Sequence, residues 1–396
     1  MIKRKNLLRG SLVSLLTIPL ASAISCGSEN EIAVGFIVTS DGKITDGYFQ
    51  PMWNSVKAGA ESNGLTADYI DLNKEGATAQ KDAVQNFIEN GSKLIFQPGF
   101  ENSKSILSNA VNNPEVNFVG VSYSNYVVAT EGFTISEGDP KIGENLSSFE
   151  KAKNLGLVNF KTHEQGFLLG FLGAEILANS GDFQTGAEIK YSEIASKDYQ
   201  DITALMDGYL AGVRAYSVVD ADHTYTYVKQ ESVYTTVTVE SPDFHSKMQT
   251  VASNSGTVDL MFVGDPNAIV DFKNQGIKVV ADGGDYKKDF NYVLAATDKN
   301  WGAIFNNAID SYKNGQQSFE KSYHDVTHLS SIENKELIMM PSDSYNNEQL
   351  NQAKSELKKW ENSLNQDSAR EVYETNDDTT LISGGSPWIG DLQPKA

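Results

Sequence analysis

The chain has 396 residues and a formal net charge of −20, with 52 acidic side chains against 32 basic ones. Such an acidic chain repels nucleic-acid phosphates and anionic lipid, which argues against a DNA-binding, RNA-binding or basic lipid-binding protein. Its single cysteine excludes an intrachain disulfide and any metal site made of several cysteines. The length predicts two domains or lobes, each with its own core.

The first 25 residues have the pattern of a signal peptide. Four basic residues precede an apolar run over 11–24, which is too short to span a bilayer. Small residues then precede Cys26 in an arrangement that resembles the lipobox of bacterial lipoproteins, after which the cysteine is acylated. We therefore predict a lipoprotein signal peptide over 1–25 and a lipid anchor (palmitate) on Cys26. Ordinary secretion with a free thiol is the alternative.

Residues 31–61 predict a strand, a polar loop and a helix. The short apolar run 32–38 is rich in β-branched residues, as a buried strand is. After the polar loop 39–47, apolar residues recur at helical spacing from Phe49 to Ala60. Ligands of doubly wound sheets bind at the carboxyl ends of the strands, so this loop is a candidate binding segment.

Strands and helices alternate along the rest of the chain. Further strands are predicted at 67–72, 93–97, 116–122, 155–160, 186–190, 258–263, 277–281 and 292–296, with a β-rich segment at 224–239. Further helices are predicted at 78–90, 103–111, 167–177, 202–216, 244–254, 267–274, 298–313 and 349–364. This alternation is typical of parallel sheets with right-handed crossovers.

The helix at 167–177 is expected to pack closely against a neighbour. Thr162 and Gln165 fit a capping box in front of its apolar run. Small residues that permit a close approach recur along it, namely Gly166, Gly170, Gly173 and Ala174. We interpret this segment as a packing helix and not as a ligand site.

Three motifs in chain order carry a family resemblance. Thr-Asp-Gly-Tyr-Phe-Gln at 45–50 is similar to an Asp-x-x-Phe-Asn signature. Residues 161–170 are similar to a Glu-x-Gly-x-Leu-x-Gly helix, and residues 208–212 are similar to a Gly-Phe-x-x-Gly pattern. These are motifs of the basic membrane protein (Bmp/PnrA-like) family, lipid-anchored nucleoside-binding proteins of ABC transporters. The resemblance covers roughly residues 31–315.

The resemblance implies the α/β, two-lobe fold of type I periplasmic binding proteins, each lobe a parallel sheet flanked by helices. We expect lobe 1 at 26–160 with a return segment at about 297–325. Lobe 2 is expected at 161–296, with C-terminal additions over 326–396.

The family match also suggests ligand-binding residues at strand ends. A nucleoside site needs aromatic faces for the base and acceptors for the ribose hydroxyls. The candidates are Asp46, Phe49, Gln50, Phe100, Gly264, Asp282 and Lys299. Gln50 departs from the Asn of the family, and Asp265 fits a helix N-cap better than a ligand group.

Enzyme motifs are absent from the sequence, including the nucleophile elbow, the Walker loop and the dinucleotide-binding Gly-x-Gly-x-x-Gly. His324 and His328 show no acid partner in the pattern, so we predict no metal and no cofactor. We predict a non-enzymatic, extracytoplasmic substrate-binding lipoprotein of an ABC importer. It would bind nucleosides, purine nucleosides above all, and act as a monomer with a membrane permease and no nucleic acid. A sugar-binding protein of the same fold, or a surface lipoprotein or adhesin without transport, are the alternatives.

Overall fold

The computed structural model describes residues 33–39, 42–45, 49–72, 77–99, 103–121, 152–196, 200–220, 225–230, 233–235, 246, 249–250, 258–264, 266–283, 290–324 and 328–363. The predicted signal peptide and Cys26 lie outside the described residues. So does most of the helix predicted at 244–254.

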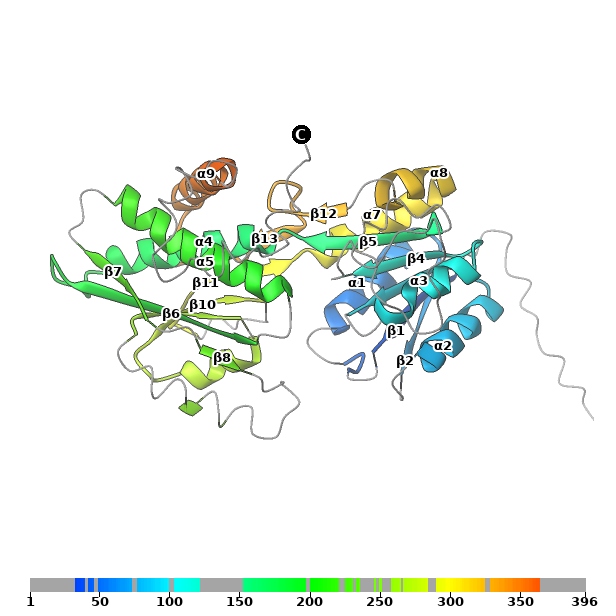
Figure 1. The fold of residues 1–396 in the computed structure, drawn as a ribbon, viewed down its shortest axis with the longest axis horizontal. Coiled ribbons are helices and arrows are strands. Elements are labelled where there is room, and N and C mark those ends of the chain that lie inside the picture. The colour runs from blue at the N-terminus through cyan, green and yellow to red at the C-terminus, as the bar shows by residue number, and fades with distance from the viewer. Residues whose placement is uncertain are drawn as a thin grey trace, which may run out of the picture.

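The chain forms two α/β halves, each built on one sheet (Figure 1). The first sheet has the order β12-β5-β4-β3-β1-β2, and all of its strand pairs are parallel. Its strands are β1 (Ala33–Val38), β2 (Thr66–Asp71), β3 (Ser92–Pro98), β4 (Asn117–Val121), β5 (Leu155–Phe160) and β12 (His328–Ser330). The chain passes from β1 to β2 on one side and then to β3 on the other, which is the switch of direction where doubly wound sheets bind ligands.

The second sheet repeats this arrangement with the order β13-β11-β10-β9-β6-β7, and β8 also pairs with β6. The pair β11–β13 is antiparallel, and the other pairs are parallel. Its strands are β6 (Glu188–Ser196), β7 (Thr226–Lys229), β8 (Val233–Thr235), β9 (Leu260–Val263), β10 (Lys278–Asp282), β11 (Val293–Lys299) and β13 (Leu337–Met339). Two mainly parallel sheets flanked by helices confirm the predicted fold class.

Helices cover both faces of the first sheet. On one face α1 (Phe49–Ser62) packs beside α7 (Trp301–Lys313), and the ring of Phe305 lies 6.5 Å from Phe36 and 5.0 Å from Phe96. The other face carries α2 (Ala77–Glu89) and α3 (Ser103–Asn112). The short helices α8 (Gln316–Phe319) and η5 (Glu320–His324) complete this half. The first core therefore needs a helix from late in the chain.

The second half is covered by α4 (Thr162–Ala178) and α5 (Gln200–Val219) on one face and by the 3-10 helix η4 (Pro266–Phe272) on the other. The last described helix, α9 (Asn347–Ser363), lies outside α4 and α5 (Figure 1). It docks through Trp360, which is fully buried and stacks on Phe167 with ring centroids 5.2 Å apart.

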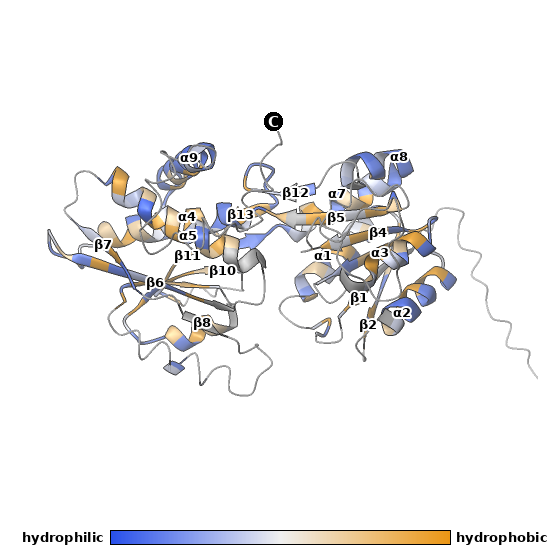
Figure 2. Ribbon diagram, viewed as in Figure 1, coloured by the Kyte–Doolittle hydropathy of each residue, from blue (hydrophilic) through white to orange (hydrophobic). Residues whose placement is uncertain are grey.

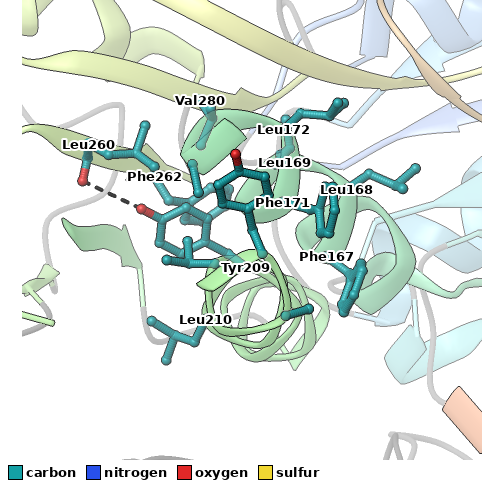
Figure 3. Packing of buried hydrophobic residues seen from close by; sticks show 14 of the residues in the cluster. Phe167, Leu168, Leu169, Phe171, Leu172, Tyr209, Leu210, Leu260, Phe262 and Val280 are labelled. Atoms are coloured by element: carbon teal, nitrogen blue, oxygen red, sulfur yellow. Dashed lines mark hydrogen bonds between the residues drawn. The ribbon is translucent and has the colours of Figure 1, made fainter. Parts of the chain in front are cut away.

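Side chains of α4 and α5, among them Phe171 and Tyr209, pack in one buried cluster with Phe262 of β9 (Figure 3). Glycines bring the two helices into backbone contact. A Cβ at Gly166 or Gly170 of α4 would lie 1.9 or 2.1 Å from carbonyl oxygens of α5. Gly208 and Gly212 of α5 are equally close to carbonyls of α4. The close packing predicted for this helix is confirmed.

Several local predictions need correction. Lys161 is the N-cap of α4 with no side-chain cap bond, so the capping box is wrong; the Gln165 amide instead donates to the Asp298 carbonyl. The helix predicted at 298–313 begins only at Trp301, because β11 continues through Lys299. The segment predicted as a helix at 267–274 is a 3-10 helix.

Within the described residues, three segments connect the halves, at 160–162, 299–301 and 330–337. The third is not indicated by the sequence pattern, and the lobe boundaries given above stay a prediction. Backbone bonds tie the segments together: Lys161 N–H donates to the Ser330 carbonyl at 2.9 Å, and Asn300 N–H to the Glu336 carbonyl at 2.7 Å. The crossings therefore form one hydrogen-bonded group.

Hydropathy follows this layered plan. Figure 2 shows hydrophobic residues gathered in the strands and in α4, while α9 is mostly hydrophilic. In the described part of the chain, the helices fall short of the length and apolar character needed to cross a membrane.

Candidate functional site

Two predicted site residues meet at the carboxyl ends of neighbouring strands. Asp282 ends β10 and Lys299 ends β11, and the Lys299 ammonium lies 3.4 Å from Oδ2 of Asp282. Their side chains keep 15% and 18% of their surface exposed, so this ion pair is shielded but accessible. Opposite charges at this distance attract each other, which holds the two side chains together.

The pair also connects the two sheets. The Lys299 ammonium lies 5.4 Å from the ring centroid of Phe160, the last residue of β5 in the first sheet. Phe160 is itself buried and packs edge-on against Trp301 at 5.7 Å. A cation over an aromatic face is attracted by the ring quadrupole. The candidate site thus includes groups from both halves at the first two crossings.

A second carboxylate lies beside the pair. Burial raises the pKa of the Asp298 carboxyl, and its hydrogen bond from the Lys299 backbone N–H and the Lys299 charge offset this only in part. Gln165 at the start of α4 donates to the Asp298 carbonyl at 3.1 Å. This bond places the first crossing directly beside the site.

The other predicted residues are more widely spread. Gly264 follows β9, one position after the Val263–Ala281 pair, so it lies at the same sheet edge as Asp282. Phe49 is buried at the start of α1, and its ring lies so close to Gly42 that a Cβ there would come within 2.2 Å. The Gln50 side chain is exposed. Asp46 and Phe100 lie outside the described residues.

Sequence reasoning misses one neighbour of Asp282 and one neighbour of Lys299. Thr297 Oγ1 donates to Oδ1 of Asp282 at 2.7 Å, and Phe160 lies under Lys299. Phe160 is the last residue of the strand predicted at 155–160, and Thr297 directly follows the strand predicted at 292–296, which is the available sequence signal. His328, which the pattern leaves without an acid partner, bonds to buried Glu336 at 2.8 Å, so that expectation is wrong.

A separate charged cluster fastens α9 to the first crossing. His163, Glu164 and Glu361 place possible metal-ligand atoms within 4.8 Å of one another. The Lys161 ammonium already lies 3.2 Å from Glu164 and 3.7 Å from Glu361, and supplies the positive charge that a metal would bring. Burial acts to raise the pKa of Glu361, but the hydrogen bond and charge of His163, the charge of Lys161 and a hydrogen bond with Glu164 together outweigh it, and the pKa is lowered.

Comparison with known families decides what kind of protein carries this site. The family described as "ABC transporter substrate-binding protein PnrA-like" (Bmp) matches residues 33–368, which includes every described element. The chain belongs to the Bmp family. This family consists of substrate-binding proteins of ABC transporters, so the protein is a binding component of that class.

Known proteins agree with this assignment. The chain is 22% identical over 311 residues to the ABC transporter nucleoside-binding protein BmpA of Lactococcus lactis. The matched region covers 75% of this chain and 79% of the relative. A solute-binding protein of an ABC transporter system from Conexibacter woesei has a TM-score of 0.57 at 15% identity, covering 83% and 95% of the two chains. One from Aeropyrum pernix has a TM-score of 0.54 at 14% identity, covering 92% and 94%. These structures support the type I periplasmic-binding-protein fold.

Proposed function

We propose that this Bmp protein binds nucleosides, purine nucleosides in preference, between its two halves and delivers them to a membrane permease. The observation that carries the proposal is the Asp282–Lys299 pair, which joins the edge of the second sheet to Phe160 of the first. The resemblance to a nucleoside-binding relative supports the choice of ligand.

Asp282 is the proposed acceptor for the ribose hydroxyls. An ionised carboxylate accepts hydrogen bonds through two oxygens and forms strong, charge-assisted bonds with hydroxyl donors. The Lys299 ammonium lies 3.4 Å from Oδ2 of that carboxylate and carries hydrogen-bond donors of its own. Phe49 and Phe100 are the proposed stacking groups for the base, which needs an aromatic face.

Binding is proposed to close the two halves around the ligand. The three crossings are joined to one another by hydrogen bonds, so the halves would rotate about them as rigid bodies. Closure would remove water from the Asp282–Lys299 pair and strengthen its bonds to the ligand. Acylated Cys26 would hold the protein on the extracytoplasmic face of the membrane beside its permease.

A binding screen tests this function. Nucleosides, bases and sugars are added to the purified protein, and a ligand at about 100 times its Kd should raise the unfolding free energy by about 2.7 kcal/mol. Calorimetric titration should then show that Asp282→Ala weakens nucleoside binding by roughly 10- to 100-fold, because hydrogen bonds to charged groups contribute about 1.5–3 kcal/mol. Asp68→Ala, the same change on the exposed edge strand β2, is the matched control and should bind normally.

The alternatives give different results in the same screen. Stabilisation by sugars and not by nucleosides would establish the sugar-binding alternative. The absence of stabilisation by every ligand, with the protein folded, would favour a surface lipoprotein without transport.

A further inference from the structure

Buried Thr297 of β11 lies beside Asp282 of β10 in the second sheet. Thr297 and Asp282 are partners in the β10–β11 ladder, and Gly283 N–H donates to the Thr297 carbonyl at 2.9 Å. The Thr297 side chain is fully buried, and its hydroxyl donates to Oδ1 of Asp282 at 2.7 Å. The backbone of both strands therefore fixes the position of this hydroxyl.

Two donors of different character hold the two oxygens of Asp282. Thr297 holds Oδ1 at 2.7 Å, whereas the flexible Lys299 side chain approaches Oδ2 only to 3.4 Å. The last torsion of an aspartate side chain has a broad energy profile, so the carboxylate plane rotates easily when nothing holds it. The shorter bond from the rigid strand sets the orientation of that plane.

The direction of the bond also restricts the ligand. A threonine hydroxyl can donate one hydrogen bond, and Thr297 donates it to Asp282. The carboxylate then has only acceptor positions left, in a fixed plane, so a ligand group that meets them must be a donor. Two neighbouring hydroxyls of one ring match two acceptor oxygens held in this way, and a carbonyl or phosphate oxygen does not.

We propose that Thr297 is a positioning residue that orients the Asp282 carboxylate and thereby gives the site its preference for a vicinal diol. This inference rests on the proposed nucleoside-binding function and adds the group that sets its specificity. Thr297 acts through Asp282 and does not itself contact the ligand.

The test compares two substitutions of the same residue. Thr297→Val replaces the hydroxyl with a methyl group of similar size, and Thr297→Ser keeps the hydroxyl. Each variant and the wild type are titrated with adenosine, guanosine and their 2′,3′-dideoxy analogues, after thermal unfolding has shown that the variant is folded. Thr297→Val should bind the ribonucleosides roughly 10-fold more weakly and lose most of the preference over the dideoxy analogues. Thr297→Ser should retain both properties.

A double-mutant cycle separates orientation of Asp282 from general loosening of the fold. In an Asp282→Ala background, Thr297→Val should cause no further loss of affinity, because the group that it positions is gone. If Thr297→Val lowers the affinity equally in both backgrounds, Thr297 does not act through Asp282. The positioning role would also be overturned if folded Thr297→Val kept the wild-type preference for ribonucleosides over dideoxy analogues. Weak ribonucleoside binding by folded Thr297→Ser would overturn it as well. A wild type that binds neither ribonucleoside would overturn the nucleoside-binding function itself, and the Thr297 role with it.

Discussion

The contact between α4 and α5 predicts a large cost for one added methyl group. In Gly170→Ala, the new Cβ would lie 2.1 Å from the Tyr209 carbonyl oxygen and 2.9 Å from the Val213 nitrogen. Ordinary contact begins at 3.4 Å, so the carbonyl is about 1.3 Å too close. Both neighbours are backbone atoms, and neither can turn aside as a flexible side chain would. The helices must therefore separate.

The expected size of the effect follows from two opposing contributions. Overpacking of a well-packed core costs about 1–3 kcal/mol, and a backbone contact belongs at the upper end of that range. Alanine favours a helix over glycine by about 1 kcal/mol, which offsets part of the cost. We expect Gly170→Ala to lower the free energy of unfolding of the second half by about 2 kcal/mol. This corresponds to a midpoint roughly 4–8 °C lower.

Gly302→Ala is the matched control for this prediction. Gly302 lies in α7, and the nearest atom to its added Cβ is Oδ1 of Asn300 at 3.6 Å, so only the gain in helix propensity remains. This variant should be as stable as wild type or up to about 1 kcal/mol more stable. Thermal and urea unfolding followed by circular dichroism measure both variants. If Gly170→Ala matches or exceeds Gly302→Ala in stability, the backbone contact between the helices is not as close as described.

Glu336 in the third crossing and Cys26 at the predicted anchor can each be tested by one substitution. Burial acts to raise the pKa of Glu336, but hydrogen bonds and charge from His328 outweigh it and the pKa is lowered. Its carboxylate therefore stabilises the fold at neutral pH and loses this effect as the pH falls through the lowered pKa. Glu336→Gln should cost about 1.5–3 kcal/mol at pH 7 and flatten acid unfolding below pH 4.5, and an unchanged acid profile would contradict this. Cys26→Ser should move the protein from the membrane to the soluble fraction, and continued detergent partitioning would disprove the lipid anchor.

The sequence predicts the architecture well because both sheets follow the local alternation of apolar strands and amphipathic helices. Asp282 and Lys299 are predicted as site residues from the family match, and the structure brings their side chains together. Thr297 was missed because its bond to Asp282 depends on the register of two strands. The false capping box has a similar origin: Gln165 makes its bond to a carbonyl 133 positions away, which no local pattern contains.

The position of α7 determines the order in which the protein can be completed during synthesis. Phe36 and Phe305 touch in the first core, and they lie 269 positions apart. At about 5–20 residues per second, a ribosome takes about 13–54 seconds to make the stretch between them. Through that time the apolar face of α1 lacks the helix that covers it, while the central strands of the second half and their helices come from one continuous stretch. The half that is made first is therefore finished late, and chaperones would find their binding surface on the N-terminal half of the nascent chain.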